Sequence, residues 1–290
     1  MKLCVACGST RCADSWVCAN CGSKPAMSAG FPAFAPKLAS ECVGFREGYF
    51  GELALLEERN FWFRARNFLI LWAMDKYFPD CRSFLEIGCG TGFVLNGVYS
   101  KYPSMRLFGS EIFTAGLKFA AKRVPSAQLY QMDARKIPFR EEFDLIGAFD
   151  VLEHIDEDEA VIAEASKALR PGGGLLLSVP QHRSLWSRQD EYACHVRRYD
   201  PGELRARVER AGFEVATEVS FVSILMPLLW MSRRLKRRST TAFDPFDELR
   251  LNNVTNMILE KVMSLERTLI MSGFRSSVGG SLLLAARKKG

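Results

Sequence analysis

The chain has 290 residues, of which 48% are hydrophobic and 25% are charged, and its formal net charge is +6. This composition is typical of a globular protein and excludes an intrinsically disordered chain, while the modest positive charge identifies no partner by itself. Met1-Lys2-Leu3 leads into cysteines without an apolar secretory segment, and the longest apolar stretch, Phe221–Met231, is shorter than the roughly 20 residues that cross a bilayer. We therefore expect a cytoplasmic protein.

Cysteines are concentrated at the start of the chain, where two Cys-x-x-Cys pairs are each followed by a glycine. This spacing is typical of the two knuckles that present sulfur ligands to one zinc ion. A pair of disulfides is the alternative, but a reducing cytosol disfavours it. We predict a zinc ribbon over residues 1–24, with Cys12 as a bystander. Its predicted ligands are Cys4, Cys7, Cys18 and Cys21.

Residues 25–46 contain Pro25, Pro32 and Pro36 among small and polar residues and show no hydrophobic period, so we predict a linker. Residues 47–80 show a helical pattern in two segments that meet near Asn60. The second segment begins with the aromatic run Phe61-Trp62-Phe63-Arg64-Ala65-Arg66-Asn67-Phe68. This run fits either a core helix whose arginines reach solvent or a lid over a ligand.

A glycine-rich turn follows the apolar strand that contains Phe84, Leu85 and Ile87. Its sequence is Gly88-Cys89-Gly90-Thr91-Gly92, and a helical pattern begins directly after it. Alternate glycines let the backbone bend and let a ligand approach closely, and the free N–H groups of the helix point toward that ligand. A dinucleotide-binding turn needs a third glycine where this chain has Phe93, so the turn favours another ligand.

Strand and helix patterns alternate over residues 81–219, which predicts a doubly wound α/β sheet. The expected strands are 84–88, 106–110, 127–131, 143–149, 174–180 and 213–219. Ligands of such sheets lie beyond the carboxyl ends of the strands. Glu111, Asp133 and Asp150 follow three of the strands, so we expect them at one ligand site.

Five segments in this region together resemble the class I S-adenosylmethionine-dependent methyltransferases. Asp150-Val151-Leu152-Glu153-His154-Ile155 is similar to a signature of small-molecule members, the quinone-biosynthesis enzymes among them. The resemblance covers about half of the chain and implies a Rossmann-like sheet of seven strands, with residues 281–290 as the last. The other four segments are 86–92, Glu111, the run that begins Asp133-Ala134, and Arg170-Pro171-Gly172-Gly173-Gly174.

The resemblance implies S-adenosylmethionine as the cofactor and a role for each matching residue. Glu86 would hold the amino acid end of the cofactor, Glu111 the ribose hydroxyls and Asp133 the adenine amino group. The aromatic run over residues 61–68 resembles a bacterial lid segment in which Arg66 and Asn67 would contact cofactor or substrate. The remaining residues placed at the cofactor are Gly88, Gly90, Ile112, Ala134, Phe149 and Asp150.

The chain has three histidines, and an imidazole suits the removal of a proton from a hydroxyl acceptor. His154 and His195 are our candidate catalytic residues, although a structural role is an equal alternative for His154. His195 begins a polar run that favours an anionic or hydroxyl-rich acceptor, and a solvated loop is the alternative. The candidate acceptor-binding residues are His182, Arg197, Arg198 and Tyr199.

Residues 220–280 form an insertion before the last strand. The apolar stretch Phe221–Met231 is followed by the basic cluster Arg233–Arg238, which fits either a helix at an anionic membrane surface or a core helix with a solvated basic end. A second helical pattern carries an apolar stripe that we expect to pack on the sheet, a partner helix or a second subunit of a homo-oligomer. That stripe contains Val254, Ile258, Val262, Leu265 and Leu269.

These patterns predict a methyltransferase that acts, at oxygen in our first hypothesis, on a small or lipid-linked acceptor, with peripheral contact to the inner membrane surface. A zinc-ribbon RNA methyltransferase is the second hypothesis. Nucleic acid is disfavoured because only Arg11, Trp16 and Lys24 in the ribbon are of the types that contact it. A non-catalytic scaffold is the third hypothesis, and the intact Glu86, Glu111 and Asp133 oppose it.

Overall fold

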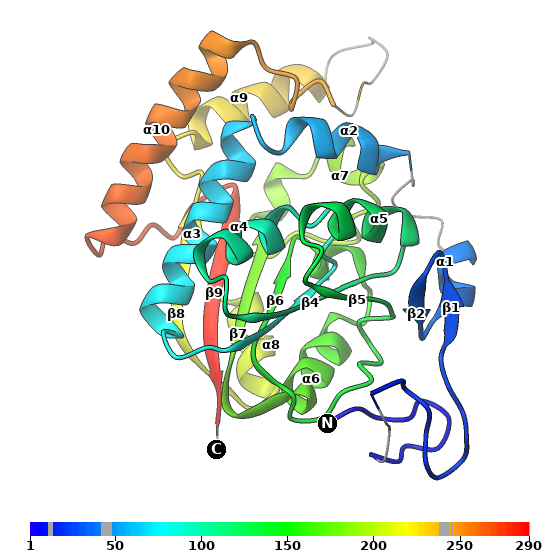
Figure 1. The fold of residues 1–290 in the computed structure, drawn as a ribbon. Coiled ribbons are helices and arrows are strands. Elements are labelled where there is room, and N and C mark those ends of the chain that lie inside the picture. Colours follow the sequence, from blue (N-terminus) through cyan, green and yellow to red (C-terminus); the bar gives the residue numbers. More distant parts are fainter. Residues whose placement is uncertain (11–13, 42–47, 238–243, 245, 290) are drawn as a thin grey trace.

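A computed structural model describes residues 1–10, 14–41, 48–237, 244 and 246–289, and it describes no side chains for residues 39–41 and 235–237. In this part of the chain nine strands form one sheet in the order β1-β2-β5-β4-β3-β6-β7-β9-β8 (Figure 1). The strands β2 to β7 pair in parallel, while β9 is antiparallel to both of its neighbours. This topology confirms the predicted α/β fold class.

Seven of the nine strands match the predicted ranges within a few residues at most ends, although β7 begins five residues early, and β1 and β2 were not predicted. Their bounds are β1 Ala26–Ser28, β2 Phe31–Ala33, β3 Ser83–Ile87, β4 Arg106–Glu111, β5 Gln128–Gln131, β6 Phe143–Phe149, β7 Leu169–Pro180, β8 Phe213–Phe221 and β9 Ser281–Lys288. The helices are α1 Pro36–Glu41, α2 Tyr49–Leu56, α3 Phe61–Tyr77, α4 Phe93–Lys101, α5 Thr114–Arg123, α6 Asp158–Ala168, α7 Arg188–Tyr192, α8 Glu203–Arg210, α9 Met226–Arg237 and α10 Asn253–Met271, with short 3-10 helices η1 Leu152–His154 and η2 Arg183–Leu185.

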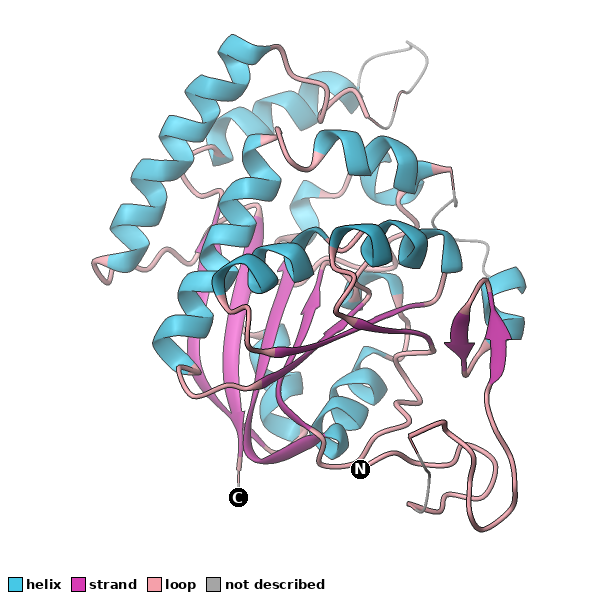
Figure 2. Cartoon of the chain, viewed as in Figure 1, coloured by secondary structure: helices cyan, strands magenta, loops and turns pink. Residues whose placement is uncertain are grey.

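The helices cover both faces of the sheet, which gives the three layers seen in Figure 2. Residues of α3, α4 and α5 pack in one apolar core, together with one face of the central strands. Residues of α6 and α8 pack in a second core on the opposite face. Because both faces of the parallel strands are covered, most residues of these strands are buried.

The prediction of a linker over residues 25–46 is wrong for residues 26–41, which contain β1, β2 and α1. The two short strands join through Ala29 and Gly30, both with positive φ, as a tight hairpin turn requires. The backbone N–H of Phe34 donates to the carbonyl oxygen of Gln131 over 2.8 Å, which joins the hairpin to β5 at the edge of the sheet. Residues 42–47 lie outside the described part of the chain.

The described residues of the first 24, which are 1–10 and 14–24, contact the sheet through Leu3 and Trp16. Trp16 is only 7% exposed and contacts the rings of Phe34, Tyr130 and Phe139, at 4.7 to 5.7 Å between ring centroids. The backbone N–H of Leu3 donates to the carbonyl oxygen of Pro138 over 2.9 Å. Trp16 is therefore a core anchor and is not available to stack on a nucleic-acid base.

Helix α10 packs against α3 through a face different from the predicted one (Figure 1). Met263, Glu266 and Ile270 are its buried residues, whereas four residues of the predicted stripe are exposed. The buried Glu266 carboxylate accepts N–H groups at the turn that leads to α9, including that of Val222 over 2.9 Å. The exposed stripe residues are Val254, Ile258, Leu265 and Leu269. Among the described residues, no helix is long and apolar enough to cross a membrane.

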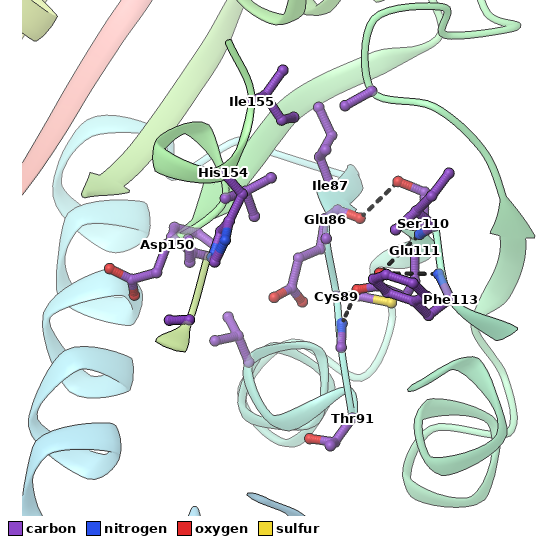
Figure 3. A pocket seen from close by; sticks show the side chains of 18 of the residues that line it. Glu86, Ile87, Cys89, Thr91, Ser110, Glu111, Phe113, Asp150, His154 and Ile155 are labelled. Carbon is purple, nitrogen blue, oxygen red and sulfur yellow. Dashed lines mark hydrogen bonds between the residues drawn. The ribbon is translucent and has the colours of Figure 1, made fainter. Parts of the chain in front are cut away.

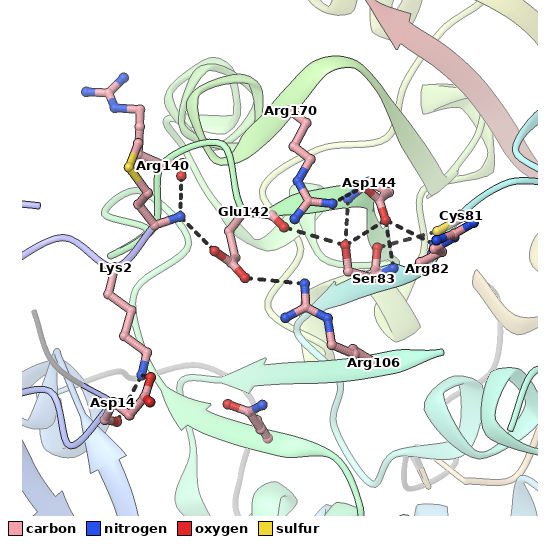
Figure 4. A network of polar contacts seen from close by, with 12 residues as sticks. Lys2, Asp14, Cys81, Arg82, Ser83, Arg106, Arg140, Glu142, Asp144 and Arg170 are labelled. Atoms are coloured by element: carbon pink, nitrogen blue, oxygen red, sulfur yellow. Dashed lines mark hydrogen bonds and ion pairs between the residues drawn. The ribbon is translucent and has the colours of Figure 1, made fainter. Parts of the chain in front are cut away.

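A polar network joins β3 and β6 at the end of the sheet opposite to the glycine turn (Figure 4). The Asp144 carboxylate accepts the backbone N–H groups of Arg82 and Ser83 over 3.0 and 2.9 Å, and it pairs with the Arg170 guanidinium over 2.5 Å. Although burial opposes ionisation, these backbone, hydroxyl and guanidinium donors lower the pKa of Asp144 below its usual value.

We expect Asp144→Asn to lower the free energy of unfolding by about 1–3 kcal/mol at neutral pH, since it removes a charge-assisted acceptor. The pKa of Asp144 is lower in the folded protein than in the unfolded chain. The stabilisation is therefore complete at pH values above the pKa of Asp144 in the unfolded chain, and it is lost as the pH falls through the pKa of Asp144 in the folded protein. Urea denaturation of both proteins at a series of pH values tests this. A difference that stays constant down to pH 2 would contradict it.

Candidate functional site

One cavity of about 570 Å³ lies beyond the carboxyl ends of β3, β4, β5 and β6. Figure 3 shows Glu86 and Glu111 rising from neighbouring strands, with Asp150 and His154 on the other side of the cavity. The structure brings together here every predicted cofactor residue and both candidate catalytic residues. They are Arg66, Glu86, Gly88, Gly90, Glu111, Ile112, Asp133, Ala134, Phe149, Asp150, His154 and His195.

Glu86 is the last but one residue of β3 and is 3% exposed. One of its carboxylate oxygens, Oε2, has no hydrogen-bond partner among the described residues. Burial raises the pKa of Glu86 well above its usual value, and the nearby charge of Arg66 does not offset this effect. A buried carboxylate without a partner is costly, so a ligand with a positive N–H group would stabilise it.

Glu111 ends β4 and is held by the backbone around the glycine turn. Its Oε2 accepts the N–H of Gly90 over 3.1 Å, and its Oε1 accepts the N–H of Ile112 over 2.8 Å. Burial raises the pKa of Glu111 although these N–H groups favour the charged form. The carboxylate is therefore fixed at the cavity wall, where it can accept hydrogen bonds from paired hydroxyls.

Asp133 and Arg135 form a local pair after β5. The Arg135 Nε lies 3.0 Å from one carboxylate oxygen of Asp133, and its Nη1 contacts Glu157 over 2.8 Å. The backbone N–H of Arg135 donates to the same Asp133 oxygen over 2.9 Å. This loop is thereby fixed, with Asp133 and Ala134 at the cavity.

The glycine turn depends on its missing side chains. Gly88 has φ of +67°, and a Cβ there would lie 2.4 Å from the Val151 side chain. Gly92 has φ of +78°, and its Cβ would lie 2.8 Å from the backbone of Ala120. Both positions therefore require glycine on grounds of conformation and of space.

A second contact to this turn comes from α2 and was not identified from the sequence. The Glu57 carboxylate, just after α2, accepts the Thr91 hydroxyl and pairs with Arg123 over 2.7 Å. Phe50 of α2 also lines the cavity and contacts Gly116 of α5 closely. No sequence motif marks Glu57, whose partners are 34 and 66 residues away. The predicted lid segment thus covers the cavity and is tied to the glycine turn.

Arg66 of α3 forms an ion pair with Asp150 at the cavity, and both are largely buried. The Arg66 guanidinium also lies over the Trp62 ring, 4.7 Å from its centroid. Asp150 has φ of +56°, a left-handed conformation that is rare outside glycine and turns its carboxylate toward Arg66 and Ser178. Asn67, the other lid residue singled out, contacts the position of Gly97 and is not among the described cavity residues.

His154 and His195 lie edge to face with their ring centroids 4.7 Å apart. Desolvation and the neighbouring His195 lower the pKa of His154 to about 3, so its imidazole is neutral at physiological pH. The Nδ1 of His195 lies 3.0 Å from Asp190, which also accepts from Arg198 Nε over 2.7 Å. Burial opposes ionisation of Asp190, but the hydrogen bond with His195 and the charge of Arg198 outweigh it and lower its pKa.

The four residues predicted to bind the acceptor do not line this cavity in the described structure. Tyr199 is fully buried and donates to Asp158 over 2.6 Å, and Arg197 pairs with the same carboxylate over 2.8 Å. Arg198 is buried against Asp190. His182 accepts the backbone N–H of Gly279 over 3.4 Å. These side chains instead hold the loop that carries His195.

The four predicted zinc ligands also lie together, at the N-terminal end of the chain. The sulfur atoms of Cys4 and Cys21 are 3.6 Å apart, and those of Cys7 and Cys18 are 3.7 Å apart. A tetrahedral zinc ion with bonds of about 2.3 Å requires separations of about 3.8 Å. Both turns are closed in the same way, because Gly8 and Gly22 donate their N–H groups to the carbonyl oxygens of Cys4 and Cys18 over 2.8 Å. The donor set therefore fits zinc.

Residues 55–218, more than half of the chain, match a family model described as a methyltransferase domain. The chain therefore belongs to this methyltransferase domain family. It is 27% identical over 163 residues to a probable S-adenosylmethionine-dependent methyltransferase of Mycolicibacterium smegmatis, a match that covers 55% of this chain and 62% of that protein. It is also 30% identical to a malonyl-[acyl-carrier protein] O-methyltransferase of Halalkalibacterium halodurans, over 33% of this chain and 38% of that one.

Among solved structures, the [4+2]-cyclase SpnF superposes with a TM-score of 0.54 at 19% identity, over 79% of this chain and 82% of that one. At this identity the likeness shows the fold alone. The chain spans less than two thirds of the length of the curated relatives that it matches. The cavity fits S-adenosylmethionine, because Glu86 offers an unpaired carboxylate oxygen, Glu111 a fixed acceptor and Gly90 an open backbone.

We expect Gly88→Ala to weaken binding of S-adenosylhomocysteine at least tenfold and to destabilise the fold by about 2–4 kcal/mol, from left-handed strain and overpacking against Val151. Gly172→Ala is the matched control, because Gly172 has φ of +72° with open space around its Cβ position and lies away from the cavity. It should cost only about 1 kcal/mol and leave binding unchanged. Calorimetry and urea denaturation measure both effects, and equal behaviour of the two variants would contradict the prediction.

Proposed function

We propose that this protein is an S-adenosylmethionine-dependent methyltransferase that methylates an oxygen atom of a small or lipid-linked acceptor. The observation that carries the proposal is the cavity in which Glu86, Glu111 and Asp133 lie at the ends of three neighbouring strands. Membership in the methyltransferase domain family and the similarity to an O-methyltransferase support the same activity.

In this proposal Glu86 binds the ammonium group of the cofactor, Glu111 the ribose hydroxyls, and Asp133 with the Ala134 backbone the adenine ring. The bound cofactor supplies an electrophilic methyl group on a positively charged sulfur atom. The acceptor oxygen forms a bond to the methyl carbon as the carbon–sulfur bond breaks, and the electron pair of that bond stays on sulfur. Much of the rate enhancement comes from alignment, which is worth roughly 7–11 kcal/mol in well-oriented reactions.

A hydroxyl acceptor must also lose a proton, and His154 and His195 are the imidazoles at the cavity. The lowered pKa of His154 makes it a weak base, because its protonated form is disfavoured by burial. His195 is the imidazole that the protein orients, because Asp190 lies 3.0 Å from its Nδ1 and leaves Nε2 free. We therefore assign proton removal to His195 and positioning of the acceptor to His154.

Peripheral contact with a membrane is proposed for the surface formed by α9 and α10. Ile224, Leu228, Trp230 and Met231 are exposed beside or on α9, and the guanidinium of Arg234 lies over the Trp230 ring, 4.1 Å from its centroid. Exposed apolar side chains next to cationic ones favour the interface of an anionic membrane. The exposed stripe residues of α10 supply a second apolar surface for this contact. A second copy of the chain is the other occupant that the test below must separate.

Zinc is proposed to stabilise the N-terminal ribbon through the four clustered cysteines. Trp16 of the ribbon contacts Tyr130 of β5, and the hairpin β1–β2 that follows the ribbon pairs with the same strand. Folding of the ribbon therefore supports the sheet at β5. An RNA-binding role is not supported, because Trp16 is buried in the aromatic core. Of the other two ribbon residues of this type, Arg11 lies outside the described residues and Lys24 is exposed.

The purified protein should transfer label from methyl-labelled S-adenosylmethionine to the lipid or the water-soluble fraction of a bacterial extract. Glu111→Ala should reduce this incorporation at least tenfold, because it removes the acceptor for the ribose hydroxyls. Label in lipid that falls when Arg234 and Lys236 are both changed to Gln supports membrane contact. Light scattering of the same proteins shows whether a dimer covers that surface instead. Label in RNA, or none in any fraction, would contradict the proposed function.

Changing Cys18 and Cys21 together to Ser should lower the zinc content of the purified protein by one ion per chain, because two of four tetrahedral ligands are lost. Mass spectrometry of the total metal content measures this. Cys81→Ser is the control, since Cys81 lies outside the cluster and should leave the zinc content unchanged. A double variant that retains its full zinc content would refute the ribbon.

A further inference from the structure

The carboxylate of Glu153 is buried without a hydrogen-bond partner. Glu153 belongs to η1, directly after β6, and its side chain is fully buried. Neither of its carboxylate oxygens has a hydrogen-bond partner among the described residues. A buried carboxylate with both oxygens unsatisfied costs several kcal/mol unless a cation or a proton compensates it. The group therefore needs a partner that the described chain does not supply.

Two imidazoles face this carboxylate. One nitrogen of His154, one of His195 and one oxygen of Glu153 all lie within 4.8 Å of one another, and Nε2 of His195 is 4.0 Å from Oε1 of Glu153. His154 and His195 also line the cavity. The cluster is thus buried at Glu153 and open toward the cavity at the histidines.

The orientation of His195 fixes which of its nitrogens is available. Asp190 lies 3.0 Å from Nδ1 and is held in turn by Arg198 and Ser187, so Nδ1 carries the hydrogen that Asp190 accepts. In the neutral ring, Nε2 then has a free lone pair directed at the Glu153 carboxylate. Two acceptors that face each other across 4.0 Å are compensated by a cation or by a proton between them. A carboxylate behind the distal nitrogen is also the usual support for a metal-binding histidine.

From this geometry we infer that Glu153, His154 and His195 bind one divalent transition-metal ion at the acceptor side of the cavity. Two imidazoles and one carboxylate leave open positions for water or for an acceptor oxygen, as in catalytic zinc and non-haem iron sites. Bonds of about 2.0–2.2 Å require the ligand atoms to move closer by about 1 Å, which side-chain rotation can supply. The role of the ion rests on the proposed function: it would orient a hydroxyl acceptor and lower the pKa of that hydroxyl. In the metal-bound protein His195 is a ligand and no longer the base, and the hydroxyl proton passes to water.

The test uses Mn²⁺ and the full-length protein with zinc in its ribbon. Mn²⁺ prefers oxygen and imidazole ligands to thiolates, so it does not compete for the cysteines. Electron paramagnetic resonance measures the Mn²⁺ that remains free. The wild type should bind one Mn²⁺ per chain, and Glu153→Gln and His195→Asn should each weaken binding at least tenfold. His182→Asn is the matched control, because this histidine lies outside the cluster and should leave Mn²⁺ binding unchanged.

Calorimetry with S-adenosylhomocysteine separates this inference from the proposed function. The Glu153→Gln protein should bind S-adenosylhomocysteine within about twofold of the wild type, which shows that the fold and the cofactor cavity are intact. If the wild type binds no Mn²⁺ at millimolar concentration, or if Glu153→Gln binds it equally well, the metal site is refuted and a proton shared by Glu153 and His195 explains the cluster. If the wild type itself does not bind S-adenosylhomocysteine, the proposed function is refuted instead.

Discussion

The rest of this structure depends on buried carboxylates at the carboxyl ends of the central strands. Glu86, Glu111 and Glu153 follow or end three strands and are almost completely shielded from water. Burial raises the pKa of all three, although Glu111 is held by several backbone N–H groups. Because an uncompensated buried charge costs several kcal/mol, the protein must supply donors or bind positive ligands there. The cavity lies beside these carboxylates, and the donors that they need determine which ligands the cavity can bind.

The helices α2 and α3, which precede β3 in the chain, form the other side of this cavity. Glu57 ties α2 to Thr91 of the glycine turn and to Arg123 of α5, and Arg66 ties α3 to Asp150 after β6. These contacts join segments that are 34 to 84 residues apart in the chain. The lid is therefore part of the site, and opening it would break two buried or partly buried ion pairs.

The fold core was predictable because its sequence features are local. Glycines at positive φ, apolar strands and carboxylates at strand ends each leave a mark within a few residues, so Gly88, Glu86 and Glu111 were placed correctly in one cavity. The hairpin β1–β2 was missed because its strands have three residues each and one contains Pro32, which conceals any alternation. It is stabilised by Gln131, about a hundred residues later.

Side-chain direction was the part that local patterns could not give. Tyr199 and Arg198 lie in a polar run that suggested acceptor binding, but the chain turns them inward onto Asp158 and Asp190. On α10 the most apolar stripe is exposed, and the buried face contains Glu266. The hydrophobic pattern missed this face because a glutamate counts against burial in such a pattern. In both cases the contact of a buried polar residue decides the orientation. Hydrophobic periodicity cannot predict such polar pairs, because it uses only the spacing of apolar residues.

The likeness to a cyclase as well as to methyltransferases shows that this fold alone does not decide the reaction. The account depends on whether the cavity between Glu86 and Glu111 binds S-adenosylmethionine. Isothermal titration calorimetry of the wild-type protein with S-adenosylmethionine measures this most directly. We predict saturable binding of one molecule per chain with a micromolar dissociation constant. Absence of binding at millimolar cofactor, by a protein shown to be folded, would contradict the account and leave the sheet as a scaffold for another function.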